Sequence, residues 1–199
     1  QGGALADYRA WGNEVPGVYQ IYPYTDNNSA AGVILYVCAD KEVTGSRVAD
    51  SAMLKAVGKS CTYDPETGMA TRKPLTAVLD PDFDESYTNI KTITEEIFDV
   101  YITGYNGDID SMKDTVKTNI ENYLLEREPY IRGLSVDNNR MDDISVNNLI
   151  GIVNEIAIAN TASFTGVSLY HSSESIAAYQ LGRGKLAKLG TLYINGVAI

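Results

Sequence analysis

Apolar residues spaced three and four positions apart predict four helices along this chain. The first runs from Leu5 to Val15, and Pro16-Gly17 ends it, because proline disfavours helical geometry in the residue before it and glycine frees the next position. The other three are expected at Ser46–Cys61, capped by Ser46, at Asp110–Glu128, with a capping box of Ser111 and Asp114, and at Ser145–Ala159, capped by Ser145.

Runs of β-branched and aromatic residues predict the strands. Val18–Tyr24 and Val33–Cys38 flank the turn residues Asp26–Ser29, so we expect them to pair as a hairpin. Ile90–Tyr105 has the pattern of one long strand, with inward and outward side chains in alternation. Further strands are expected at Met69–Val78, at Phe164–His171 and once or twice within Ser175–Val197, and a loop is expected at Asp80–Tyr87.

This order of elements predicts an α+β fold of two small subdomains, 1–107 and 108–199, each with a few strands packed by one or two helices. A helix followed by a Gly-Val strand occurs in both halves, at Gly17-Val18 and at Gly166-Val167. A common origin of the two halves and coincidence both remain open.

Composition narrows the class of partner. The chain has 199 residues, of which 44% are hydrophobic, enough for a substantial core. Its net charge of −10 repels phosphate backbones and anionic lipid, so neither nucleic acid nor membrane is expected as a partner. Cys38 and Cys61 are expected to be small buried hydrophobes. The start at Gln1-Gly2-Gly3, without Met, indicates a fragment of a longer protein or a short added segment at this end.

The reactive side chains form no motif that predicts a catalytic, cofactor or metal site. His171 is the only histidine, too few for a zinc set, and Gly182-Arg183-Gly184-Lys185 lacks the spacing and the hydroxyl of a phosphate loop. The acidic loop Asp80–Glu85 lacks the glycine of a calcium loop. We therefore predict that the chain is not an enzyme and uses no cofactor or small-molecule substrate.

Two other classes of function remain open from the residues. A carboxylate-dependent hydrolase needs two carboxylates close together, one with a raised pKa. A carbohydrate- or ligand-binding module would line a groove with exposed aromatics. The chain has fourteen tyrosines, and those considered for such a groove are Tyr19, Tyr22, Tyr101 and Tyr105.

Asp7-Tyr8-Arg9-Ala10-Trp11 is followed by Val15-Pro16-Gly17-Val18 and then by the aromatic-Pro pair Tyr22-Pro23. This order resembles the baseplate J-like family of contractile phage tails, whose members commonly have an Asp-Tyr-x-x-Trp/Ala helix, then Val-Pro-Gly-Val, then an aromatic-Pro pair. The family's amino-terminal region is absent, so the resemblance implies a carboxy-terminal fragment. Arg72-Lys73-Pro74-Leu75-Thr76-Ala77 is similar to a second family stretch, and Leu186–Leu192 resembles a segment that often closes these chains. The motif residues, expected to be structural, are Tyr8, Arg9, Trp11, Pro16, Gly17, Val18, Leu189 and Gly190.

The resemblance implies a structural protein of the virion, made in the host cytoplasm. Such proteins form the wedge and ring of the tail baseplate around the hub. The implied partners are other wedge proteins and copies of the chain itself, and no cofactor is needed. Tyr8 and Trp11 should pack in the first core, and Pro16, Gly17 and Gly190 should serve backbone geometry rather than chemistry.

Overall fold

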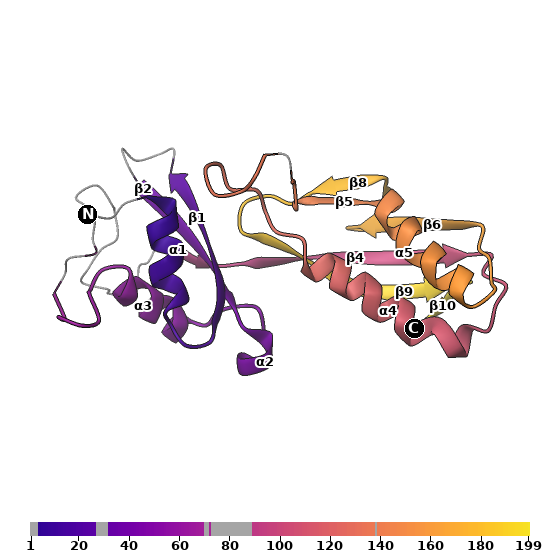
Figure 1. Cartoon of the computed structure of the whole chain (residues 1–199), viewed down its shortest axis with the longest axis horizontal. Helices are drawn as coiled ribbons and strands as arrows, with labels where there is room; N and C mark the ends of the chain where they lie inside the picture. The colour runs from indigo at the N-terminus through magenta and orange to yellow at the C-terminus, as the bar shows by residue number, and fades with distance from the viewer. Residues whose placement is uncertain (1–3, 27–31, 70–71, 73–88, 138) are drawn as a thin grey trace. The chain divides into compact units, whose positions relative to one another are not determined.

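The chain folds into two compact units, seen in the computed structural model (Figure 1). The structure describes residues 4–26, 32–69, 72, 89–137 and 139–199. Both units combine a sheet with helices, so the predicted α+β class is confirmed. The first unit comprises Gln1–Thr94 and Ile131–Asn139, and the second comprises Glu95–Tyr130 and Arg140–Ile199.

The first unit is built on a three-stranded sheet in the order β1-β2-β3. β1 (Val18–Asp26) and β2 (Gly32–Ala39) pair antiparallel, which confirms the predicted hairpin, and β3 (Ile90–Thr92) joins β2 in parallel. β2 is buried along most of its length, as its continuous apolar sequence indicates. The expected turn residues that follow Asp26 lie outside the described part of the chain.

Two helices pack on this sheet. α1 (Leu5–Asn13) contacts β1 and α3 (Ser51–Ser60), and α3 contacts β3. The fully buried Tyr8 and Val57 meet Ile21 of β1 in the core of the unit. The first helix is thus where the apolar spacing predicts it.

The helix predicted from Ser46 begins later, because the residues before it are held by the sheet. The Ala39 N–H donates to the Arg47 carbonyl (2.9 Å), so the segment after the short helix α2 (Lys41–Thr44) runs beside β2. Asp50, not Ser46, is the N-cap of α3. The prediction of Ser46 as N-cap was wrong, and its hydroxyl instead accepts the N–H of Val48.

The second unit is built on a five-stranded sheet in the order β10-β9-β4-β6-β7. Its two helices lie side by side over one face of the sheet (Figure 1). Alternate residues of the central strand, Phe98, Val100 and Ile102, are fully buried beneath them. The elements of this unit are β4 (Thr94–Thr103), α4 (Ile109–Leu125), β5 (Asp143–Ser145), α5 (Val146–Ala159), β6 (Gly166–His171), β7 (Glu174–Ile176), β8 (Ala178–Gln180), β9 (Lys185–Ile194) and β10 (Val197–Ala198).

The single strand predicted over Ile90–Tyr105 is two strands in two different sheets. β3 ends at Thr92 and pairs with β2, whereas β4 begins at Thr94 and pairs with β6. Thr94 and Glu95 belong to different units, and the first unit also takes in Ile131–Asn139, whereas the sequence-based division lay at 107/108. Inward and outward side chains alternate in every strand, so this pattern in the sequence does not show where the chain passes from one sheet to another.

The helices of the second unit follow the apolar pattern, with one difference at a cap. α5 is capped by Ser145 as predicted, its hydroxyl accepting the N–H of Asn148 (3.3 Å). α4 is capped by Asp108, not by the expected box of Ser111 and Asp114. Residues 174–198 form four strands, β7 to β10, where one or two strands were predicted. The strand expected at Met69–Val78 and the loop at Asp80–Tyr87 fall almost wholly outside the described residues.

Candidate functional site

The residues of the first sequence patch meet where α1 approaches the sheet. Tyr8 is fully buried, and its ring lies edge-on to that of Trp11 with 5.5 Å between centroids. Gly12 permits this close approach, because a Cβ there would lie 2.5 Å from Cγ1 of Ile21. Arg9 ties the same helix to β1 by donating its Nε–H to the Ile21 carbonyl (3.0 Å). The motif residues of α1 thus form the helix–sheet contact.

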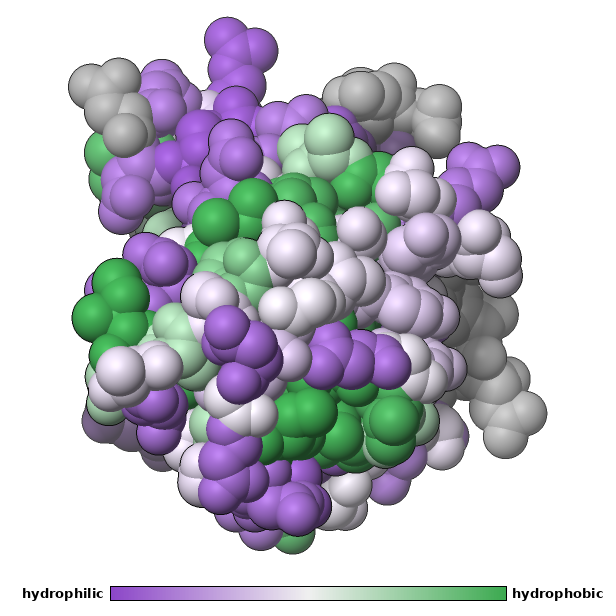
Figure 2. All heavy atoms as spheres, turned by 90° about the vertical axis from the view of Figure 1, so that its right-hand side faces the viewer, coloured by the Kyte–Doolittle hydropathy of each residue, from purple (hydrophilic) through white to green (hydrophobic). Residues whose placement is uncertain are grey.

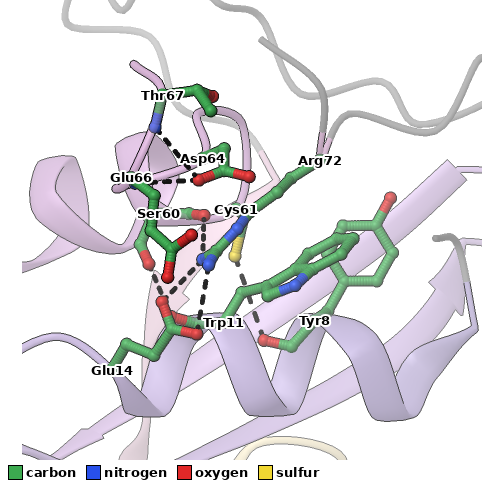
Figure 3. Close-up of polar contacts among 9 residues, drawn as sticks. All are labelled: Tyr8, Trp11, Glu14, Ser60, Cys61, Asp64, Glu66, Thr67 and Arg72. Carbon is green, nitrogen blue, oxygen red and sulfur yellow. Dashed lines mark hydrogen bonds and ion pairs between the residues drawn. The ribbon is translucent and has the colours of Figure 1, made fainter. Parts of the chain in front are cut away.

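Arg72 joins the second sequence patch to this contact (Figure 3). Its guanidinium donates to both carboxylate oxygens of Glu14, at 2.6 and 3.2 Å, and to the carbonyl of Ser60 at 3.2 Å. It also lies 5.8 Å from the centroid of the Trp11 ring. The Ser60 hydroxyl in turn donates to the Trp11 carbonyl (2.6 Å). Arg72 therefore clamps the ends of α1 and α3 together, and Gly12, Glu14 and Ser60 are contacts that the sequence patches did not single out.

Cys61 lies beneath this clamp and is buried. Its thiol contacts the Tyr8 carbonyl (Sγ–O 3.9 Å). Burial raises the pKa of the Cys61 thiol to about 12, against a smaller lowering by Arg72. Burial also raises the pKa of the Tyr8 phenol. Neither group is poised as a nucleophile, because the reactive form of a cysteine is the thiolate.

We expect the Arg72–Glu14 pair to contribute a coupling free energy of about 0.5–1 kcal/mol, because the Glu14 side chain is 46% exposed and solvent screens the pair. A double-mutant cycle of Arg72→Met and Glu14→Gln, read by urea unfolding, measures this coupling. The exposed pair Asp110–Lys113 is the comparison, with Asp110→Asn and Lys113→Met. High salt should reduce both couplings. A coupling of zero for Arg72–Glu14 at low salt would contradict a stabilising role of this pair.

The raised pKa of Cys61 predicts a loss of stability at alkaline pH. The unfolded thiol ionises above about pH 8.5, whereas the folded thiol stays protonated to about pH 12. The unfolded state therefore binds fewer protons, and the free energy of unfolding falls as pH rises through this range. Urea unfolding at several pH values above about 8.5, the pKa of the unfolded thiol, should show a shallower decline in Cys61→Ser than in the original chain. Equal slopes would contradict the prediction.

The Val15-Pro16-Gly17-Val18 patch is a tight turn between α1 and β1. The Val18 N–H donates to the Val15 carbonyl (3.1 Å), and Gly17 has a φ of +84°. Proline at the second position and a left-handed residue at the third are typical of a type II turn. The Gly17 carbonyl then accepts the N–H of Asp40 (2.8 Å). The turn thereby fixes where β1 enters the sheet.

In the second unit, Gly190 allows β9 to pass close to β4. A Cβ at Gly190 would lie 2.4 Å from Oδ1 of Asp99 and 2.7 Å from Cγ2 of Ile97. The same Asp99 oxygen accepts the N–H of Thr191 (2.7 Å). Leu189 is half-buried and packs against the core of the unit. The two motif residues of β9 thus lie at a strand contact, far in sequence from the α1 patch.

A second polar cluster surrounds Glu96 at the start of β4. Its carboxylate accepts from Nζ of Lys185 and lies 3.0 Å from Nε2 of His171. The His171 ring stacks on Phe98, with 4.9 Å between centroids, and lies 4.6 Å from the Tyr179 ring. The sequence analysis missed Glu96. Its position two residues before Phe98, on the inward side of the strand, was the signal that could have found it.

The remaining candidates for chemistry are occupied by structural contacts. Lys185 of the glycine loop binds Glu96, and Ser172 and Ser173, with φ of 50° and 67°, form the turn after His171. Asp142 is paired with Arg140, whose hydrogen bond lowers the pKa of that carboxyl.

Within the described ranges, no three His, Cys, Asp or Glu side chains are grouped to hold a metal ion. No helix among the described residues is both long and apolar enough to cross a bilayer. The acidic loop Asp80–Glu85 lies outside the described residues.

The four tyrosines considered for a ligand groove differ in burial. Tyr22 is 1% exposed and Tyr105 is 4% exposed, so neither can stack on a ligand. Tyr19 is 63% exposed. Tyr101 stacks on Tyr193 of the neighbouring strand at 4.3 Å between centroids, which occupies one face of its ring. The four tyrosines together therefore do not support a ligand-binding groove.

Comparison with known proteins bears on the first unit. Residues 1–81 match the family model described as the baseplate J-like central domain. No curated protein matches the chain. The match ends at residue 81, so the similarity of Leu186–Leu192 to the family stays a prediction. Residues 1–81 are therefore similar to the central domain of baseplate J-like proteins, which are structural components of the phage tail baseplate, and this match confirms the resemblance seen in the sequence patches.

Proposed function

We propose that this chain acts through protein–protein contacts in the wedge and ring of a phage or prophage tail baseplate. Its partners are other wedge proteins and copies of itself, and its place is the virion. The match of residues 1–81 to the baseplate J-like central domain carries this proposal. The observed chemistry of the motif residues agrees with it, since Tyr8, Arg9 and Gly17 hold a helix, a sheet and a turn together.

Exposed apolar side chains also support contacts with other proteins. The second helix of the second unit, α5, exposes Ile158 (68%) on its outer side, and α2 of the first unit exposes Val43 (70%). The face seen in Figure 2 has several hydrophobic patches among hydrophilic residues. Isolated exposed apolar residues are common, but contiguous patches are typical of interaction sites.

Light scattering of the purified chain, alone and mixed with the products of neighbouring genes, tests the proposal. We expect self-association that grows with concentration, or a complex of fixed stoichiometry with a neighbour. A strict monomer that binds none of the neighbours would contradict it. Failure of this test leaves the family assignment of residues 1–81 in place but removes the assembly role from this chain.

Variants of exposed residues make the test specific to a surface. Ile158→Asp and Val43→Asp should weaken any contact through α5 or α2 while leaving the fold intact, because both side chains are largely exposed. Asn154→Asp adds the same charge to α5 at an exposed polar position and is the matched control. Equal masses for Ile158→Asp, Asn154→Asp and the original chain would place the contact elsewhere than on α5.

A further inference from the structure

Glu96 is a buried carboxylate whose oxygens are shared among basic groups from other strands. It lies on β4, and 9% of its surface is exposed. Lys185 of β9 binds Oε1, and His171 of β6 faces Oε2. Tyr179 of β8 lies against the His171 ring and hydrogen-bonds to the same carboxylate. Near the start of β4, the Glu96 side chain thus links four strands: β4, β6, β8 and β9.

The two ring nitrogens of His171 both face hydrogen-bond acceptors. Nδ1 lies 3.1 Å from the carbonyl oxygen of Ile97, and Nε2 lies 3.0 Å from Oε2 of Glu96. A neutral imidazole carries only one N–H, so one of these contacts would set a lone pair against an oxygen. The doubly protonated ring donates to both. The contact geometry therefore matches the cationic form of the ring.

Two neighbours of His171 in the cluster, Lys185 and Tyr179, keep their protons across neutral pH. The hydrogen bond that Lys185 donates to Glu96 raises the pKa of Lys185, and burial, with a smaller effect of Glu96, raises the pKa of Tyr179. Glu174, opposite His171 on β7, is exposed. His171 is also the only histidine of the chain. Among side chains, imidazole is the one that ordinarily titrates between about pH 5 and 8.

We infer that His171 is a proton-dependent latch, which ties β6 to the first residues of β4 when its ring is protonated and releases one of its two contacts when the ring is neutral. The latch binds Glu96 and Ile97, which lie two and three residues after Thr94, where the chain first passes from the first unit to the second. It would make the second unit most stable on the acidic side of neutrality. The inference stands on the second unit alone and does not depend on the assembly role.

Urea unfolding of the chain at about pH 6 and about pH 8.5, followed by circular dichroism, tests the latch against the ordinary titration range of imidazole. His171→Gln is the control, because its amide donates one hydrogen bond and does not titrate in this range. We expect the unfolding equilibrium constant of the original chain to rise roughly tenfold more than that of His171→Gln, since a hydrogen bond to a charged group is at stake. The same pH dependence in both proteins would overturn the inference.

A second measurement keeps the inference testable if His171→Gln does not fold. The ring nitrogens of the single histidine can be followed by ¹⁵N NMR in the uniformly labelled chain without assignment of other residues. Two protonated nitrogens at about pH 7, where most free imidazole is neutral, would support the latch. One protonated and one bare nitrogen at that pH would overturn it.

Discussion

Replacing Tyr8 by alanine is expected to lower the free energy of unfolding of the first unit by about 3–5 kcal/mol, the range for truncating a buried aromatic side chain. Tyr8 is fully buried and packs with Ile21 and Val57 in the core, so its removal leaves a cavity beneath α1. Urea unfolding followed by tryptophan fluorescence is the measurement. Trp11 is the only tryptophan of the chain, and its ring lies 5.5 Å from that of Tyr8, so its emission reports on the first unit.

Tyr8→Phe is the matched control for this prediction. The Tyr8 hydroxyl is buried without a hydrogen-bond partner among the described residues, so its removal leaves no donor or acceptor unpaired. We expect the phenylalanine variant to be as stable as the original chain or more stable by up to about 1 kcal/mol. A large loss in Tyr8→Phe would mean that the hydroxyl, and not the ring, carries the contribution of this residue.

The second large effect is expected at Gly190. An alanine there would place its Cβ within 2.4 Å of Oδ1 of Asp99, and the strands would have to separate or the Asp99–Thr191 hydrogen bond would break. Overpacking and the lost hydrogen bond together predict a destabilisation of the second unit by about 2–4 kcal/mol. Unfolding followed by circular dichroism should show the loss, while Trp11 fluorescence reports an unchanged first unit.

Gly151→Ala is the matched control for Gly190→Ala. Gly151 lies in α5 of the same unit, with no heavy atom within 4 Å of the position of the new Cβ. Alanine has the higher helix propensity, so this variant should be more stable by about 0.5–1 kcal/mol. If Gly190→Ala were as stable as Gly151→Ala, the close approach of β9 to β4 would not explain the glycine.

The motif residues that indicated the family are explained by packing. Pro16 and Gly17 build the turn that joins α1 to β1, and Arg9 anchors α1 on the β1 backbone. Arg72 forms an ion pair with Glu14, the C-cap residue of the same helix. These contacts hold α1, α3 and β1 in one arrangement.

Local pattern in the sequence was enough to predict the helices α1, α4 and α5 and the hairpin of β1 and β2. Each depends on contacts within a few residues: the spacing of apolar side chains, the turn at Pro16-Gly17, and the Ser145 cap. The family resemblance likewise came from short patches, and the match of residues 1–81 confirms it. These signals are local, so they survive in the sequence without knowledge of what packs against them.

The tertiary structure alone decided the features that depend on distant residues. The run Ile90–Tyr105 has one alternation pattern, yet pairing with β2 and with β6 divides it between two sheets. The start of α3 was moved by the hydrogen bond between Ala39 and Arg47. The cluster of Glu96, His171 and Lys185 joins residues up to 89 positions apart, counted from 96 to 185. Strand pairing and buried charge pairs are set by which surfaces meet in the fold, and periodicity along the chain does not contain that information.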